Sequence, residues 1–532
     1  MVELEIKKFI DELESRVKPL RREAGLAYWN ASISGKKEDF DIYTSLSEKV
    51  SKIFNEKDGF EKIKKFKETK INDDLLRRQI DIVYNSYLGG QGDINLISKI
   101  LKKVSEIEHK FNIFRANVDG KEISDNDIKN LLRTELDSDK LRIAWEASKK
   151  QGGLVAKDVI EVVKLRNERA KQIGFDNYYQ MSMELGEQKV EEVAKIFDEL
   201  AKDSEGAFRN LKNEIDEILS KRYNISKNDL KPWHYHDLFF QEGPRIYDLD
   251  IDEIYKNGFL EQVKNFYKGI DLDADDVLNR GDLYEKKGKN QHAYCIDIDR
   301  DGDIRILQNV KNDSKWGETT LHELGHGVYQ KFIDKKLPYF LRDNAHTLST
   351  EAIAQLFGRQ ANNINFLKSL RNIGKEEEMR IKEDAVNVLR LRQVVFARWC
   401  LVMMNFERGL YENPDQDLNK LWYSLVSKYQ LLNFQRDKPD WASKIHLISS
   451  PVYYHNYALG EMYASQIHAY ICKNILKINM VRNVNYFGTK EIGNYLKDRI
   501  FSLGMKYKWD ELAERSTGEK LNPKYFVKEF II

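Results

Sequence analysis

The chain has 532 residues, of which 41% are hydrophobic, and this is enough to bury a large core. Its 87 lysines and arginines nearly balance its 86 aspartates and glutamates, so the charge favours neither nucleic acid nor an anionic membrane as a partner. The charged N-terminal segment has no apolar signal core, no apolar run is long enough to cross a bilayer, and three scattered cysteines argue against a disulfide framework. We therefore expect a cytoplasmic protein that binds neither nucleic acid nor membrane.

Most of the chain is predicted to be helical. Only eight prolines interrupt it, and no Gly/Ser/Pro-rich linker divides it into modules. Apolar residues recur at helical spacing at Ile6, Phe9, Ile10 and Leu13, from Leu96 to Phe114, and within residues 154–174, 190–220, 376–411 and 455–478. Such stripes are typical of helices that face a core, and they predict one large helical body over residues 1–532.

A short hairpin is the exception to this helical pattern. Residues 293–298 and 304–308 read as two strands that flank Asp301-Gly302, a favoured hairpin turn. The acidic spacing of this segment also imitates a calcium loop, but Gln308 occupies the position that needs a bidentate glutamate. The segment therefore predicts a small antiparallel β element rather than a calcium site.

The sequence His322-Glu323-Leu324-Gly325-His326 follows, within a helix-like run from Trp316 to Phe332. Histidines four positions apart fall on one face of a helix, where two neutral imidazoles can bind one Zn²⁺ ion. Glu323 then lies beside the open side of the metal and can act as a general base. The alternative is an ordinary helix with two surface histidines and a solvated glutamate.

A third ligand decides between these alternatives. Thr347 is a plausible N-cap of a second helix, with Glu351 in its first turn. The interval between His326 and Glu351 is long enough for the first helix to end, a loop to turn and the second helix to begin. Two imidazoles, one carboxylate and a water make a hydrolytic rather than a structural zinc site. Such a zinc ion lowers the pKa of its water to roughly 7 and polarises a carbonyl group. On its own, Glu351 is equally consistent with a glutamate favoured by the helix dipole.

These motifs resemble those of the peptidyl-dipeptidase A family, the zinc peptidases that include angiotensin-converting enzyme, with a more distant likeness to the thimet oligopeptidase and oligoendopeptidase group. The likeness covers roughly residues 232–530, whereas the first 230 residues match only in helical character. The residues that carry it are His322, Glu323, His326 and Glu351; His292-Ala293-Tyr294-Cys295; Lys444-Ile445-His446; Tyr454 and Tyr457; and Gln241.

The resemblance implies a mainly α, two-lobed zincin fold with a deep central cleft, a small β element next to the metal helix, and lid helices within residues 1–120. It implies one Zn²⁺ per chain, held by His322, His326 and Glu351, with Glu323 as general base. His446 and Tyr457 would stabilise the tetrahedral intermediate.

The remaining matched residues imply how a peptide would be held. Gln241, Lys444 and Tyr454 would bind the terminal carboxylate of the substrate. His292, Ala293 and Cys295 would hold its backbone along a strand. Without the resemblance, Lys444 and Gln241 read as surface polar residues and the tyrosines as packed aromatics.

Two departures from the family pattern concern the surroundings of the site. Asn456 precedes the second tyrosine where chloride-activated members carry an arginine, so the sequence does not predict chloride activation. Gln355 replaces an aspartate four residues beyond the zinc glutamate, so the hydrogen bonds around the metal ligands must differ.

The expected function is therefore release of C-terminal dipeptides from oligopeptides with a free C-terminus. A glutamine rather than an arginine at position 241 favours dipeptides over single residues. An oligoendopeptidase, a zinc carboxypeptidase and a catalytically silent peptide-binding protein are the alternatives, and the intact Glu323 argues against the last. Either a monomer or a homodimer is compatible with the sequence.

Overall fold

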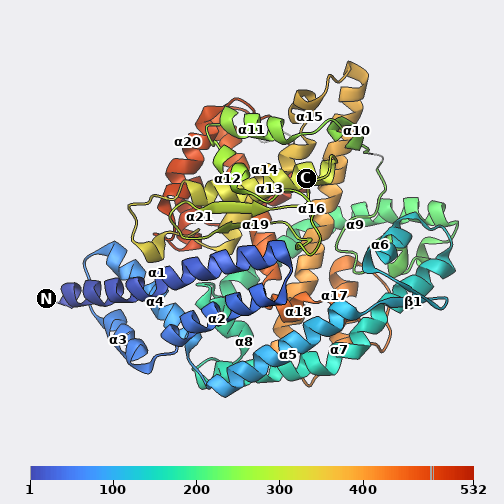
Figure 1. The fold of residues 1–532 in the computed structure, drawn as a ribbon. Coiled ribbons are helices and arrows are strands. Elements are labelled where there is room, and N and C mark those ends of the chain that lie inside the picture. Colours follow the sequence, from blue (N-terminus) through green and yellow to red (C-terminus); the bar gives the residue numbers. More distant parts are fainter. Residues whose placement is uncertain (1, 248, 480–481, 483, 532) are drawn as a thin grey trace. The chain divides into compact units, whose positions relative to one another are not determined.

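The computed structural model describes residues 2–247, 249–479, 482 and 484–531. Within this part of the chain, helices dominate, and the only sheets are two antiparallel pairs, β1–β2 and β3–β4. Figure 1 labels strand β1 and most of the helices along the chain. The prediction of a mainly α fold with a small antiparallel β element is confirmed.

The chain forms two compact units, each assembled from three separate stretches of sequence. Unit 1 consists of Met1–Gln91, Leu249–Ala385 and Leu459–Asn522; unit 2 consists of Gly92–Asp248, Val386–Ala458 and Pro523–Ile532. The predicted lid segment, residues 1–120, is therefore divided between the units after Gln91. Its role as a lid stays a prediction.

Unit 1 contains the N-terminal helices and the metal helix. Its elements are α1 (Val2–Ser34), α2 (Lys37–Phe54), α3 (Lys57–Glu68), α4 (Asp74–Gly90), α10 (Asp252–Tyr255), α11 (Leu260–Gly269), α12 (Asp275–Arg280), β3 (Tyr294–Asp297), β4 (Ile304–Leu307), α13 (Ser314–Lys331), η3 (Tyr339–Leu341), α14 (Thr347–Gly358), η4 (Arg359–Asn362), α15 (Ile364–Leu370), η6 (Ile471–Leu476), α20 (Lys490–Arg499), η7 (Phe501–Leu503) and α21 (Trp509–Thr517).

Unit 2 contains the remaining long helices. Its elements are α5 (Ile94–Ile113), β1 (Ala116–Val118), β2 (Lys121–Ile123), α6 (Asp125–Thr134), α7 (Ser138–Gln172), α8 (Tyr178–Leu185), α9 (Val190–Tyr223), η1 (Lys227–Asp229), η2 (Pro232–Tyr235), α17 (Leu418–Gln430), η5 (Asp440–Ser443), α18 (His446–Ser449) and α22 (Lys524–Phe530). Two helices, α16 (Lys375–Glu412) and α19 (Tyr454–Tyr470), each contain one of the points where the chain passes from one unit to the other.

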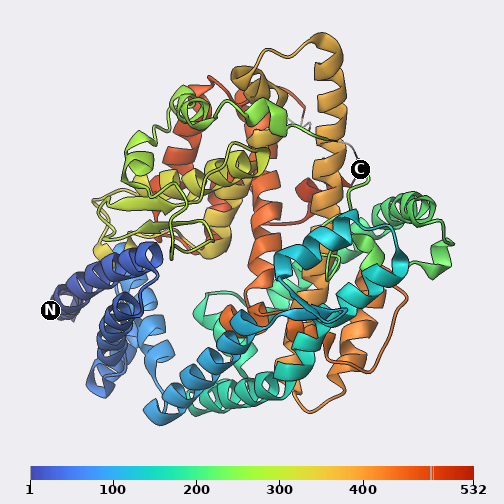
Figure 2. The same ribbon diagram turned by 45° about the vertical axis from the view of Figure 1, so that its right-hand side comes forward.

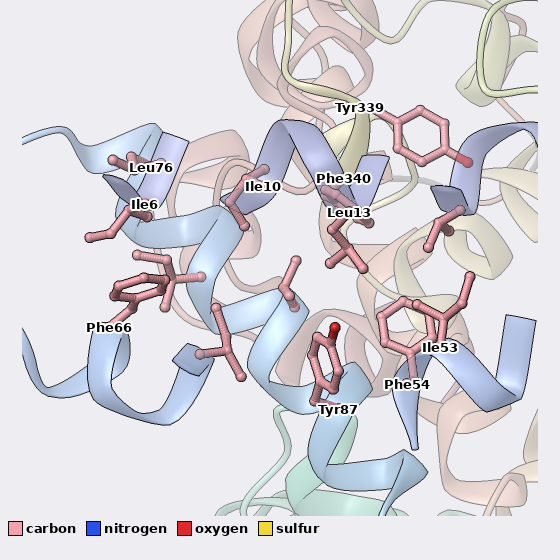
Figure 3. Close-up of a cluster of buried hydrophobic side chains, with 14 residues drawn as sticks. Ile6, Ile10, Leu13, Ile53, Phe54, Phe66, Leu76, Tyr87, Tyr339 and Phe340 are labelled. Atoms are coloured by element: carbon pink, nitrogen blue, oxygen red, sulfur yellow. The ribbon is translucent and has the colours of Figure 1, made fainter. Parts of the chain in front are cut away.

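The first four helices share one apolar core. In α4, Asp73 caps the first turn by accepting a hydrogen bond from the N–H of Leu76 (3.0 Å), and Leu76, Ile80, Val83 and Tyr87 then recur at intervals of three or four residues. Helices α1 and α2 lie side by side in both Figure 1 and Figure 2. Figure 3 shows their apolar side chains pointing toward those of α3, α4 and η3. The stripe predicted from residue 6 to residue 13 thus faces this core.

The hairpin packs against the metal helix within unit 1. Strands β3 and β4 pair in antiparallel register, with Tyr294 opposite Leu307, and both contact α13. The observed strands are slightly shorter than predicted, since residues 293, 298 and 308 lie outside them. A hydrogen bond from the N–H of Ile298 to the carbonyl of Asp303 (3.0 Å) closes the turn. Carboxylates of Asp297 and Asp299 accept backbone N–H groups inside this turn.

Among the described residues, none of the helices combines the length and the apolar composition that a bilayer span requires.

Replacing Ile80 by Ala should lower the free energy of unfolding by about 2–5 kcal/mol, because the side chain is fully buried in the cluster of Figure 3 and its loss leaves a cavity. Urea unfolding followed by circular dichroism measures this change. Ile42→Ala, at a site 54% exposed on α2, is the matched control and should change the value by less than about 0.5 kcal/mol. Equal losses in the two variants would show that this cluster does not stabilise unit 1.

Candidate functional site

The two helices that carry the predicted metal ligands pack in close contact in unit 1. Asp313 is the N-cap of helix α13, and its carboxylate accepts a hydrogen bond from the N–H of Trp316 (2.8 Å). At Gly325, a Cβ atom would lie only 2.7 Å from the Cα atom of Ala354 on α14. The glycine between the two histidines therefore permits the close approach of α14 that brings Glu351 toward them.

His322, His326 and Glu351 converge in a geometry that suits one metal ion. Their ligand atoms all lie within 4.8 Å of one another, and Nε2 of His322 is 3.8 Å from Oε2 of Glu351. Two imidazoles and one carboxylate form the donor set of a hydrolytic zinc site, which leaves room for water. The residues present thus fit the ion that the sequence predicts, and their role as ligands stays a prediction.

His326 is oriented by a neighbour that the sequence did not single out. Its Nδ1 atom lies 2.7 Å from Oγ1 of Thr350, so Nε2 is left for a metal. Burial, and then the neighbouring His322, hold the pKa of His326 well below its usual range, which favours the neutral imidazole that binds metals. The sequence predicted that the hydrogen bonds around the ligands differ, because Gln355 stands where chloride-activated members of the resembled family carry an aspartate. It did not indicate that Thr350 supplies the hydrogen bond to His326.

The N-cap of α14 is one residue earlier than predicted. The sequence predicted Thr347 as the N-cap, but the helix begins at Thr347 and its N-cap is His346, whose Nδ1 accepts from the N–H of Leu348 (3.1 Å). An imidazole nitrogen can replace the usual hydroxyl or carboxylate oxygen in this position because it offers the same acceptor.

Glu323 is a buried carboxyl group beside the metal triad, with 7% of its surface exposed. Burial raises its pKa to about 8, and the charge of Glu351 adds to this, whereas a hydrogen bond from the backbone N–H of Cys295 opposes it. A metal ion bound at the neighbouring triad would lower this pKa again, because its positive charge favours the carboxylate.

Strand β3 lies beside Glu323, and the residues of the predicted substrate strand are distributed along it. Cys295 is in β3, whereas Ala293 and the exposed His292 precede the strand. Burial raises the pKa of the Cys295 thiol well above its usual value, so it is not a reactive thiolate. In the described chain β3 pairs only with β4, which leaves its second edge without a strand partner.

Five other residues that the sequence singled out form a second group, within unit 2. We call Gln241, Lys444, His446, Tyr454 and Tyr457 the Lys444 cluster. The Lys444 ammonium donates to Oε1 of Gln241 (2.5 Å) and lies 5.3 Å from the centre of the Tyr454 ring. The Tyr454 ring in turn contacts His446 (5.0 Å between centroids) and Tyr457 (5.7 Å). The structure thus brings these five residues together.

Lys444 is a buried cation, only 8% exposed. Burial lowers its pKa to about 8, because a charged ammonium loses hydration in the interior. Within the described residues no carboxylate oxygen lies within 4.0 Å of its nitrogen; Gln241 supplies a neutral acceptor instead. An anion that enters this cluster would therefore gain a strong, incompletely compensated electrostatic attraction.

Several hydrogen bonds, which the sequence did not predict, hold the loop that carries Gln241. One carboxylate oxygen of Asp237 accepts from the N–H groups of Phe239 (3.0 Å) and Gln241 (2.8 Å). The side-chain amide of Gln430 donates to the carbonyls of Phe239 and Phe240. Asp237 lies two and four residues before its donors, a local pattern that would have indicated a tight turn.

Two buried side chains, those of Arg166 and Glu407, hold the segment that leads to Tyr454. Arg166 donates to the carbonyls of Leu447 (3.1 Å) and Ile448 (2.8 Å), and Glu407 accepts from the N–H of Val452 (2.7 Å). Val452 has a φ of +55°, a strained conformation for a β-branched residue, so the contact with Glu407 helps to maintain it. Neither Arg166 nor Glu407 carried a recognisable sequence signal.

The chain matches models of known protein families. A family model described as Peptidase family M3 matches residues 138–532, which include the metal triad and the Lys444 cluster. A second model, described as Angiotensin-converting enzyme, matches residues 2–235. The resemblance predicted from the sequence is confirmed, although the second match falls on the N-terminal region, where we recognised only helical character.

Two curated proteins are similar to parts of this chain. Carboxypeptidase 1 of Bacillus subtilis (strain 168) is 22% identical over 264 residues, which are 44% of this chain and 51% of that protein. Angiotensin-converting enzyme-related protein of Drosophila melanogaster is 25% identical over 257 residues, which are 45% of this chain and 40% of that protein. The match thus spans about half or less of each relative.

Thr350→Val should weaken zinc binding by about 10- to 100-fold, because His326 loses the hydrogen bond that orients its ring. Competition with a zinc-binding dye measures the affinity. Thr319→Val is the matched control, since that hydroxyl donates only to the carbonyl of Lys315 on the exposed side of α13. Unchanged affinity in Thr350→Val would contradict the orienting role.

Glu407→Gln should reduce the loss of stability that occurs as pH rises. Burial raises the pKa of Glu407 from 4.5 to about 8, so ionisation of this group penalises the folded state from about pH 4.5 upward and reaches its full cost above about pH 8. The cost is on the order of a few kcal/mol, and glutamine keeps the acceptor for Val452. Thermal melts at pH 5 and pH 8.5 test this, and an equal shift with pH in both proteins would refute it.

Proposed function

Because this chain belongs to peptidase family M3, we propose that it is a zinc metallopeptidase that releases dipeptides from the free C-terminus of oligopeptides. The observation that carries the proposal is the convergence of His322, His326 and Glu351 beside the buried Glu323. A structural metal site would need no proton carrier with a raised pKa at that place.

His322, His326 and Glu351 would hold the metal ion. When bound, Zn²⁺ supplies Lewis acidity: it polarises a scissile carbonyl and acidifies water. Neutral His326 is ready to bind without first losing a proton, because burial already disfavours its charged form. Thr350 keeps its ring in the orientation that points Nε2 toward the other two ligands.

Glu323 would take the proton from the attacking water at its carboxylate and deliver it to the amine that leaves. Burial raises the pKa of Glu323, and the charge of a bound Zn²⁺ would lower it again, which would leave the ionised carboxylate that a base requires. The N–H of Cys295 keeps this carboxylate in place. In this proposal the free edge of β3 binds the peptide backbone, with His292 and Ala293 at its beginning. Backbone recognition of this kind predicts broad side-chain specificity.

The Lys444 cluster would bind the terminal carboxylate of the peptide. An ammonium, a side-chain amide and a phenol, from Lys444, Gln241 and Tyr454, are suitable donors for one carboxylate. His446 and Tyr457 would donate to the oxyanion that develops on the substrate during attack, where such a donor contributes on the order of 3 kcal/mol. Both contact Tyr454, which supports a shared role.

Similarity to a carboxypeptidase supports a second candidate, a metallocarboxypeptidase that removes single residues. Gln241 favours the dipeptidase, because an arginine there would reach further toward the substrate than a glutamine bonded to Lys444. Internal cleavage of the oligoendopeptidase kind is the third outcome. We do not propose chloride activation, since Asn456 is neutral and its side chain accepts from Gln188 (2.8 Å).

Digestion of a nonapeptide, followed by mass spectrometry, should show successive losses of two residues from the C-terminus. The C-terminal amide of the same peptide should be cleaved much more slowly, because it lacks the charge that the Lys444 cluster binds. A chelator should stop both reactions. Losses of single residues would indicate the carboxypeptidase, and internal cuts that ignore the amide would indicate the endopeptidase.

Glu323→Gln supplies the catalytic control for this digest. It should retain the metal and lower the rate by at least about 10²–10⁴-fold, the typical contribution of a general base. Glu376→Gln, an exposed glutamate on α16, should keep the full rate. A Glu323→Gln protein with undiminished activity would refute the assigned role of Glu323.

A further inference from the structure

A second buried lysine lies next to the Lys444 cluster in unit 2. Lys149, on α7, is only 4% exposed. Its ammonium nitrogen lies 3.2 Å from the centre of the Phe239 ring, and Lys444 lies 5.3 Å from the centre of the same ring. The only hydrogen bond of this ammonium in the described structure is a long one to Oγ of Ser443 (3.4 Å). Phe239 is two residues from Gln241, and Ser443 precedes Lys444.

The carboxylates near Lys149 are already engaged by other groups. Asp440 accepts two hydrogen bonds from Arg436 (2.8 and 2.5 Å) and another from the hydroxyl of Tyr423. Asp237 accepts from backbone N–H groups of its own loop. Within the described chain, no carboxylate oxygen lies within 4.0 Å of either lysine nitrogen. Two buried ammonium groups therefore share one region without a direct ion pair.

This arrangement has an electrostatic cost that a ligand can relieve. Burial lowers the pKa of Lys149 to about 7; Asp440 and Asp237 oppose this shift, and Arg436 and Lys444 add to it. A ring face and one hydroxyl stabilise a buried cation less than a carboxylate does. An anion that binds at the Lys444 cluster would supply the missing negative charge and would favour the protonated form of Lys149.

We propose that Lys149 is a second cation of the carboxylate site, a positioning residue that touches no substrate atom but strengthens binding of a peptide's free C-terminus through its charge next to Phe239. The inference rests on the proposed function and names a determinant of its selectivity for free over blocked C-termini. Binding would then be linked to proton uptake. Affinity would be highest below about pH 7 and would fall as pH rises, because the peptide must bind the protonated form.

The alternative is a purely structural lysine, whose ammonium simply packs on Phe239 and supports the Gln241 loop. The two roles differ in what their loss changes. Loss of a structural lysine would affect free and amidated peptides alike and at all pH values. Loss of a lysine that acts through its charge would weaken binding of only the peptide with a free carboxylate, and mostly at low pH, where the lysine is protonated.

Binding is best measured in the zinc-loaded Glu323→Gln protein, which should turn the peptide over far more slowly than the parent and lacks the ionisable group of Glu323. Isothermal titration calorimetry with a nonapeptide free acid and its amide, from pH 6 to 9 in buffers of different ionisation enthalpy, gives both affinity and protons taken up. Lys149→Met is combined with this background, and Lys150→Met, at the exposed neighbouring position, is the matched control.

Lys149→Met should weaken binding of the free acid about tenfold at pH 6.5, equivalent to one pKa unit of coupling, and leave the amide unchanged. Proton uptake near pH 8 should decrease to the part that Lys444 contributes. Lys150→Met should match its parent. With Glu323 intact, Lys149→Met should raise KM for the free acid and leave kcat within about twofold.

Equal affinity and equal proton uptake with and without Lys149 would overturn this inference alone. Equal weakening toward acid and amide would also overturn it, in favour of the structural role. A parent protein that binds neither peptide would instead refute the proposed function and this inference together. Circular dichroism melts verify that Lys149→Met is folded, which the removal of a buried charge favours.

Discussion

Close packing of α13 against α14 is the constraint on which the chemistry of this protein depends. A metal ligand set assembled from two helices needs the carboxylate of one helix within a few ångströms of the imidazoles of the other. The absence of a side chain at Gly325 meets this need, since any Cβ there would collide with Ala354. The Thr350 hydroxyl, next to Glu351 on α14, then orients His326, so one helix supplies both a ligand and the group that orients another.

Ionisable side chains are buried in both units, and burial has a different consequence in each. In unit 1 it raises the pKa of Glu323 into the range where proton transfer is useful. In unit 2 it leaves Lys444 and Lys149 with neutral or aromatic neighbours instead of carboxylates. Buried ionisable groups that lack an oppositely charged neighbour in direct contact reduce stability, so the presence of Glu323, Lys444 and Lys149 is easier to explain by function than by folding.

The sequence was most informative where the chemistry is local. The spacing of His322, Glu323 and His326 within one helix, the helix that begins before Glu351, and the hairpin next to α13 were all predictable, because helical and strand periodicities place such residues on known faces. The apolar stripe of α1 likewise predicted a core-facing helix.

What the sequence could not predict depends on contacts between distant segments. Lys149 contacts Ser443, 294 positions further along the chain, and Glu407 contacts Val452, 45 positions further along. No periodicity encodes such pairs. Thr350 and the His346 cap were missed for a different reason: their side chains have several ordinary roles, and only the folded geometry selects one. The role of the first 120 residues and the division into units were equally beyond local patterns.

X-ray absorption spectroscopy at the zinc edge of the metal-loaded protein identifies the atoms that bind the ion. We expect one ion per chain with two imidazole nitrogens and carboxylate or water oxygens at about 2.0–2.2 Å. A sulfur ligand at about 2.3 Å, or a spectrum without imidazole scattering, would contradict it, because the ion would then be bound away from His322, His326 and Glu351.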